Sequence, residues 1–112
     1  MFNSCSFTGR LAGEPKLFEK DGVLRAVFTL AVDRDKRGED GEYETDFLDF
    51  VAWRDSADFV RRCVHSGDMI TVAGARAQVR KHEMDGQRRY KVEFVADQIY
   101  FNQSKRDKAE KE

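Results

Sequence analysis

Residues 45–54, TDFLDFVAWR, form the stretch that decides the fold of this chain. Aromatic and β-branched residues dominate it, and neither Gly nor Pro interrupts it, which is typical of a β-strand. Because side chains alternate between the two faces of a strand, one face carries only apolar groups, those of Leu48, Phe50 and Ala52. The other face, called the mixed face below, carries Phe47, Asp49, Val51 and Trp53. The apolar face is predicted to lie in the core.

The mixed face permits two interpretations. Its charged neighbours Asp46 and Arg54 suit a partly solvated surface, on which an exposed ring could stack a nucleobase for ~1–3 kcal/mol per base. Alternatively, both faces are buried, as in a β-sandwich, and Trp53 belongs to the core. The stretch alone leaves this choice open.

The length and composition indicate one folded domain with a heavily charged exterior. A chain of 112 residues with 40% hydrophobic residues supports a single core. Charged residues make up 37%, yet 20 Lys and Arg oppose 21 Asp and Glu, for a formal net charge of −1. A protein that coats nucleic acid through charge alone should be basic overall, so phosphate binding would need local clusters of cations. We expect the domain to span residues 1–102, followed by a charged, disordered tail at 103–112.

Little in the sequence suggests catalysis or a bound cofactor. Cys5 and Cys63 are widely separated and match no metal-ligand spacing, and His65 and His82 belong to no nucleophile motif. We therefore expect no metal, no cofactor and no enzymatic activity. Because the sequence shows no signal peptide and no apolar run long enough to cross a membrane, we expect a cytoplasmic protein with reduced thiols and no membrane partner.

The N-terminal segment is predicted to contain one strand and a turn. Residues 2–8 should form the first strand, ended by Gly9. Residues 10–15 hold the only Pro of the chain, which has no amide hydrogen for a strand ladder, and should form a turn. Residues 16–20 are a candidate extension of a strand before the turn at Asp21-Gly22 and are not counted as a separate strand.

A long strand and a loop are expected next. Residues 23–32 predict a strand whose core face carries Ala26, Phe28, Leu30 and Val32. Residues 33–44 are nearly all charged and include two glycines, so they have too little apolar surface to bury. We expect them to form a mobile hairpin loop.

The residues after the central stretch predict one helix. It should span residues 55–65, with Asp55 or Ser56 capping its first amides and Gly67 at its C-terminal end. Its apolar face is formed by Ala57, Val60 and Val64, which recur at helical spacing.

Two long strands should complete the domain. The first covers residues 69–81, with Gly74 marking a bend or bulge. A turn at residues 84–87 leads into the last strand, residues 88–101.

This order of elements predicts an all-β fold, a five-stranded oligonucleotide-binding (OB) barrel with one helix between its third and fourth strands and with long hairpins. The charge pattern adds a basic hairpin, opposed by only two carboxylates and containing Arg76, Arg80, Lys81, Arg88, Arg89 and Lys91. This hairpin suggests an electrostatic groove, although a merely solvated hairpin has the same composition.

Several short motifs, in this order and spacing, resemble those of bacterial-type single-stranded-DNA-binding proteins over roughly residues 2–101. They are FTGRL at 7–11 followed by Glu14-Pro15, FTLAV at 28–32, DF at 46–47, VAWR at 51–54, the helix ending in Gly67, then Gly74, and GQRRY at 86–90. The resemblance implies sequence-independent binding of single-stranded DNA by a homotetramer, in replication, recombination and repair at the nucleoid. Phe47 and Trp53 match two base-stacking positions of that family.

Together, the charge pattern and the resemblance give ten candidate nucleic-acid-binding residues. They are Arg10, Arg34, Lys36, Phe47, Trp53, Arg54, Arg76, Arg80, Lys81 and Arg89.

The sequence also departs from the family pattern. Cations stand where two further aromatic residues are usual, at Arg34 to Lys36 and at Lys81 beside His82, and Asp49 occupies a position that is often basic. The charged residues 105–112 lack the acidic, apolar tip through which the family recruits other proteins, so no such partners are expected. These departures suggest a diverged member that binds more through charge than through stacking.

Two alternatives remain at this point. The loss of two aromatic residues favours an OB-fold protein–protein adaptor of a replication or mobile-element assembly with weak nucleic-acid binding. RNA is an alternative ligand, because stacking and charge do not depend on the sugar.

Overall fold

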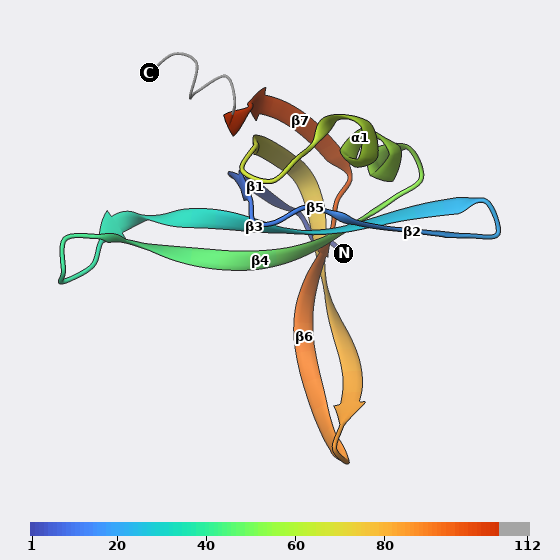
Figure 1. Ribbon diagram of the computed structural model, residues 1–112. Coiled ribbons are helices and arrows are strands. Elements are labelled where there is room, and N and C mark those ends of the chain that lie inside the picture. The colour runs from blue at the N-terminus through green and yellow to red at the C-terminus, as the bar shows by residue number, and fades with distance from the viewer. Residues whose placement is uncertain (106–112) are drawn as a thin grey trace.

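The structure is a computed structural model, and it describes residues 1–105. Within these residues the elements follow one another as β1 (Cys5–Leu11), β2 (Lys16–Lys20), β3 (Val23–Arg37), β4 (Tyr43–Trp53), α1 (Asp55–Cys63), β5 (Met69–Met84), β6 (Gln87–Val95) and β7 (Gln98–Gln103). Figure 1 shows a small body from which the β3–β4 and β5–β6 hairpins project in different directions. The tail was expected to be disordered from residue 103, but Gln103 still belongs to β7. Most of the expected tail, residues 106–112, lies outside the described part of the chain.

The strands form one sheet that closes on itself, which confirms the predicted all-β OB architecture. Strand β1 pairs antiparallel with both β3 and β5, so the path β1–β3–β4–β6–β5 returns to its start. The ring is completed by a parallel pairing of β4 with β6, in which Phe50 lies opposite Phe94. When the five strands of this ring are counted in chain order, α1 lies between the third, β4, and the fourth, β5, as the order of elements predicted.

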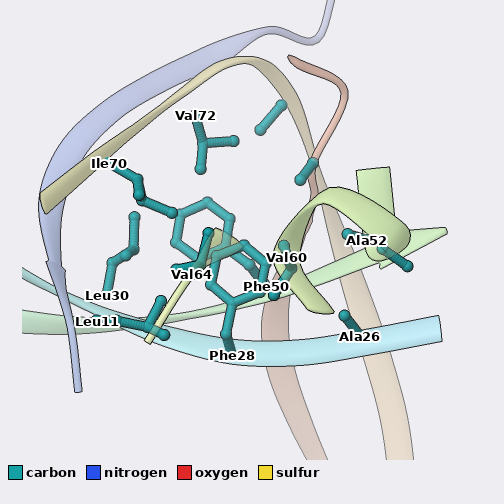
Figure 2. Close-up of a cluster of buried hydrophobic side chains, with 13 residues drawn as sticks. Leu11, Ala26, Phe28, Leu30, Phe50, Ala52, Val60, Val64, Ile70 and Val72 are labelled. Atoms are coloured by element: carbon teal, nitrogen blue, oxygen red, sulfur yellow. The ribbon is translucent and has the colours of Figure 1, made fainter. Parts of the chain in front are cut away.

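The core contains the predicted apolar face of residues 45–54. Phe50 and Ala52 are fully buried, and the Phe50 ring stacks on that of Phe28 with centroids 5.3 Å apart. Helix α1 covers this cluster with Ala57 and Val60, and Val64 packs against it directly after the helix ends. Figure 2 shows Val60 and Val64 beside the Phe50 ring. Leu48, at the outer end of the same face, is partly buried.

The prediction that Gly9 ends the first strand is wrong. Strand β1 continues through Gly9 to Leu11, which is buried, so Arg10 and Leu11 do not belong to the turn. A Cβ atom on Gly9 would lie 2.6 Å from the carbonyl oxygen of Ala31 and 2.9 Å from Val32 Cγ2. Glycine therefore permits a close approach of β1 to β3 and does not break the strand.

The expectation of a mobile loop at residues 33–44 is also wrong for most of its length. Strands β3 and β4 extend to Arg37 and from Tyr43, and they stay paired at Asp33–Thr45 and Arg37–Tyr43. The Arg37 guanidinium lies 5.2 Å from the centre of the Tyr43 ring. Backbone hydrogen bonds between the two strands and contacts between side chains across them therefore order this part of the hairpin, although it has little apolar surface to bury.

The helix is shorter than predicted and begins differently. It ends at Cys63, and no side chain caps its first amides. The Ser56 hydroxyl donates instead to the carbonyl oxygen of Asp97 at 2.9 Å. Gly67 has a positive φ of 87°, as a C-terminal cap would, but it lies in the turn after the helix, where its amide donates to the Leu11 carbonyl.

The last two predicted strands are confirmed in part. Gly74 has a φ of 71° and lies where the β1–β5 register shifts by one residue, which is a bulge. The turn at residues 84–87 is present, with Asp85 and Gly86 both at positive φ. The segment 88–101 is not one strand, because Ala96 and Asp97 separate β6 from β7. At this break the Ala96 amide donates to the Val51 carbonyl.

Candidate nucleic-acid interface

The mixed face of β4 presents two exposed aromatic rings. Phe47 is 65% exposed and Trp53 is 47% exposed. At the rise of an extended strand, they lie about 20 Å apart. Between them Val51 is only 2% exposed, since it pairs with Val27 and Val95 on the neighbouring strands. The solvated interpretation therefore holds for both rings, whereas Val51 belongs to the core.

A groove of about 510 Å³ lies between β3 and β4 on one side and the β5–β6 hairpin on the other. Four cations line it, namely Lys16, Arg80, Lys81 and Lys91, together with His82. Three carboxylates also line it, namely Glu14, Asp49 and Glu93. The sequence identified Arg80 and Lys81 as site residues, but not Lys16, His82 or Lys91.

Two of the four cations in this groove are engaged by carboxylates. Lys91 Nζ lies 2.7 Å from Asp49 Oδ2, and an Arg80 guanidinium nitrogen lies 3.3 Å from Glu93 Oε2. Within residues 1–105, no carboxylate lies within 4 Å of the ammonium groups of Lys16 and Lys81. Lys16 and Lys81 are thus the groove cations available to an incoming phosphate.

Asp49 is held as a carboxylate inside the groove. Partial burial opposes its ionisation, but the hydrogen bonds from Lys91 and Thr29 outweigh this effect and lower the pKa of Asp49. The Thr29 hydroxyl donates to Asp49 Oδ1 at 2.8 Å. A negative charge therefore lies in the groove at neutral pH, where it opposes the binding of a polyanion.

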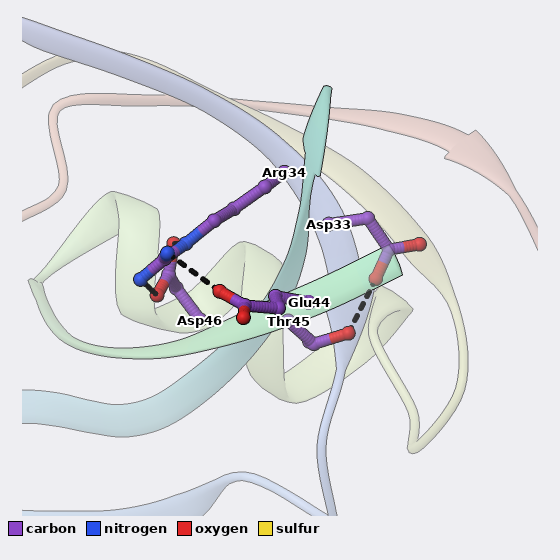
Figure 3. Close-up of polar contacts among 5 residues, drawn as sticks. All are labelled: Asp33, Arg34, Glu44, Thr45 and Asp46. Carbon is purple, nitrogen blue, oxygen red and sulfur yellow. Dashed lines mark hydrogen bonds and ion pairs between the residues drawn. The ribbon is translucent and has the colours of Figure 1, made fainter. Parts of the chain in front are cut away.

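Arg34 is engaged by two acidic side chains of the opposite strand (Figure 3). Its guanidinium donates to both carboxylate oxygens of Asp46, at 3.0 and 3.1 Å, and to Glu44 at 2.7 Å. The hydrogen bond with Asp46 is the main cause that raises the pKa of Arg34 and lowers the pKa of Asp46. A phosphate that bound Arg34 would have to compete with both acids. Lys36, two residues along β3, is exposed.

The remaining predicted cations are dispersed. Arg10 donates to the Gly67 carbonyl at 3.0 Å, an internal contact that joins β1 to the turn after α1. Arg76 lines a separate hollow with Gly74 and Asp97. Arg89 is exposed and lies opposite His82 in the hairpin.

Arg54 directly follows Trp53 and has an unusual backbone conformation, with φ 56° and ψ −115°. Its amide donates to the Leu24 carbonyl, and its own carbonyl accepts from Asp58 at the start of α1. This turn ends β4 directly after Trp53, so Trp53 is the last residue of the strand.

Two further residues lie beside Trp53 and were not identified as site residues from the sequence. Arg25 on β3 pairs with Trp53, and Phe18 on β2 pairs with Arg25. Arg25 falls within the strand expected at residues 23–32 and Phe18 within the extension considered at residues 16–20, but neither expectation reveals which residue of a neighbouring strand lies opposite.

Comparison with known proteins identifies the family of the chain. The model of the "Single-strand binding protein family" matches residues 2–102. The chain belongs to this family. The resemblance read from the short motifs is thereby confirmed, and family membership favours nucleic-acid binding over an adaptor role.

Two relatives show how much of the chain the family covers. The chain is 40% identical to "Single-stranded DNA-binding protein 3" of Listeria innocua over 111 residues, which are 97% of this chain and 69% of the relative. It is 35% identical to "Single-stranded DNA-binding protein 1" of Clostridium acetobutylicum over 108 residues, which are 94% of this chain and 97% of the relative.

Solved structures of family members have the same fold. The small single-stranded DNA-binding protein of Streptomyces coelicolor superposes with a TM-score of 0.74 at 24% identity, and Plasmodium falciparum SSB in complex with ssDNA superposes with 0.79 at 21% identity. Each alignment covers 91% of this chain and 96% of the other. At this level of identity, the likeness concerns the fold.

Proposed function

We propose that this chain binds single-stranded DNA without sequence specificity and protects it during replication, recombination and repair. The observation that carries the proposal is the pair of exposed rings, Phe47 and Trp53, on one face of β4 beside a groove lined with cations. Bases stack on the rings, and Lys16 and Lys81 contact phosphates. The similarity to relatives that are single-stranded DNA-binding proteins supports this proposal.

The chemistry of this surface selects unpaired strands. Stacking on an exposed ring requires the face of a base, which a duplex keeps inside its own stack. Every base has such a face, so stacking discriminates little between sequences. Stacking and phosphate contacts also act on RNA, since neither requires the 2′-hydroxyl to be absent.

Tryptophan fluorescence tests the proposal directly. Trp53 is the only tryptophan of the chain, so its emission reports on one position of the interface. Poly(dT) should quench it, whereas duplex DNA of equal phosphate concentration should not. Poly(U) provides the comparison with RNA. Equal quenching by duplex and single strand, or none by either, would contradict the proposal.

We also propose that the protein acts as a homotetramer in the cytoplasm, at the nucleoid. A single small barrel offers only a short track for a strand, which several subunits would lengthen. The exposed apolar side chains Phe2, Tyr100 and Phe101 are candidates for burial between subunits. Phe7, at the start of the FTGRL motif, instead packs edge-on against Phe50 and Phe94 within the subunit. None of the helices among the described residues is long and apolar enough to span a membrane.

A further inference from the structure

Three side chains on neighbouring strands form a row beside the proposed interface. Phe18 on β2, Arg25 on β3 and Trp53 on β4 are cross-strand partners, so they share one face of the sheet. The Arg25 guanidinium carbon lies 4.6 Å from the centre of the Phe18 ring and 5.9 Å from that of Trp53. Both distances are within the range of a cation–π contact.

Arg25 differs from the arginines that pair with carboxylates. Arg34, Arg61, Arg62 and Arg80 each bind a carboxylate. Within residues 1–105, no carboxylate lies within 4 Å of the Arg25 guanidinium, although Glu19 and Asp21 line the same depression. Aromatic rings therefore hold Arg25 while its N–H donors stay free of acids.

The row borders a depression large enough for part of a nucleotide strand. Its volume is about 660 Å³, within the usual range for sites that bind small molecules. Phe18 is 46% exposed and Trp53 is 47% exposed, while Arg25 is half-buried between them. Lys20 adds a second cation at its rim.

The depression lies on the same face of the sheet as the groove. Along β3 and β4, the pair Arg25–Trp53 and the pair Thr29–Asp49 in the groove are separated by an even number of residues, so they lie on the same face. A strand that leaves the groove and passes Trp53 therefore meets Arg25 next, and then Phe18.

From this arrangement we propose that Phe18, Arg25 and Trp53 form one preassembled subsite for single-stranded DNA, which extends the interface onto the β2–β3 hairpin. Arg25 binds a phosphate, and the rings of Trp53 and Phe18 stack bases on either side of it. This inference rests on the proposed function. Because the rings already fix the arginine in the free protein, little side-chain freedom is lost when the phosphate binds.

Salt-dependent titrations with oligo(dT) test the subsite. In R25A, the slope of log affinity against log salt should become flatter by about 0.7, the value for one phosphate contact on a single strand. R25K should keep that slope, since its charge remains, but bind more weakly because a lysine lacks the planar group that the rings hold. F18A should weaken binding by about 5- to 150-fold, the equivalent of ~1–3 kcal/mol for one stacked base, without changing the slope.

Arg37 supplies the matched control. It lies on the same strand and also stacks on an aromatic ring, that of Tyr43, but at the far end of the β3–β4 hairpin. R37A should leave the slope unchanged. Circular dichroism and thermal unfolding verify that each variant is folded.

The outcomes separate this inference from the proposed function. If the wild-type chain does not bind oligo(dT), the proposed function fails. If the wild type binds but R25A and F18A both keep its affinity and salt slope, only the subsite is refuted. An equal loss of slope in R25A and R37A would also refute it, because the effect would then reflect overall charge.

Discussion

Replacing Asp49 with Asn should strengthen the binding of single-stranded DNA. The substitution removes the carboxylate that engages Lys91 at 2.7 Å, while an Asn side chain can still accept the hydrogen bond from Thr29. Lys91 then becomes available to a phosphate. One added contact steepens the slope of log affinity against log salt by about 0.7. The advantage of D49N over the wild type should therefore shrink by about 2.6-fold when salt is raised fourfold.

The assay is a titration of Trp53 fluorescence with oligo(dT) of one length at several salt concentrations. The matched control is D58N, which removes a carboxylate whose pKa is also lowered and which pairs with Arg61 and Arg62 on α1, outside the groove. D58N should leave the slope unchanged. If D49N bound more weakly than the wild type, the ion pair would serve to hold the hairpin in place, and the reasoning that Asp49 opposes a polyanion would be refuted.

Four further predictions follow from the same structure. In W53A, the affinity for a labelled oligo(dT), measured by anisotropy, should fall by ~1–3 kcal/mol; unchanged affinity in a folded variant would remove Trp53 from the interface. K81A and K36A should each flatten the salt slope by about 0.7 for poly(dT) and poly(dA) alike, and a change of base preference without a change of slope would contradict their phosphate contacts. Light scattering without DNA should give the mass of an oligomer, tetramer ahead of dimer; the mass of one 13.0 kDa chain at micromolar concentration would contradict the assembly. Because the pKa of Asp49 is lowered in the folded state, its pair with Lys91 stabilises the fold above the ordinary carboxyl pKa and is lost as the pH falls through the lowered value. The difference in unfolding free energy between wild type and D49N, at most about 1 kcal/mol at neutral pH for this partly exposed pair, should therefore vanish in acid.

The core could be predicted from the sequence because its signal is local. Alternation in residues 45–54 and 23–32 placed Phe50, Ala52, Phe28 and Leu30 on faces that are buried in the structure. Helical spacing likewise placed Val60 on the apolar face of the helix, and Val60 is buried in the structure. These patterns need no knowledge of what lies opposite each strand.

The wrong predictions, at Gly9 and at residues 33–44, both concern contacts between segments that lie apart in the sequence. Gly9 looked like a strand end because its close neighbour, Ala31, is 22 positions away in the sequence. Residues 33–44 looked mobile because they lack apolar groups, whereas Arg34 is held by Asp46 and Glu44 from the opposite strand. Each outcome depends on the cross-strand register, which the composition of one segment does not specify.

At the candidate site, too, features within one segment could be predicted, whereas contacts between strands could not. The exposure of Phe47 and Trp53 agrees with the family resemblance, and the basic hairpin was visible as a run of cations. The engagement of Lys91 by Asp49 requires β6 to lie beside β4, and the row of Phe18, Arg25 and Trp53 requires β2, β3 and β4 to lie side by side.

The projecting β5–β6 hairpin is expected to open locally while the rest of the domain stays folded. Every residue from 78 to 92 is exposed, so this part is held mainly by its own ladder of backbone hydrogen bonds. It can separate and re-form without disturbing Phe50 or Ile70, and its amides exchange with solvent through such local opening. Amides beside the core exchange only when the domain unfolds. The hairpin can therefore loosen and close again many times during the lifetime of one folded molecule.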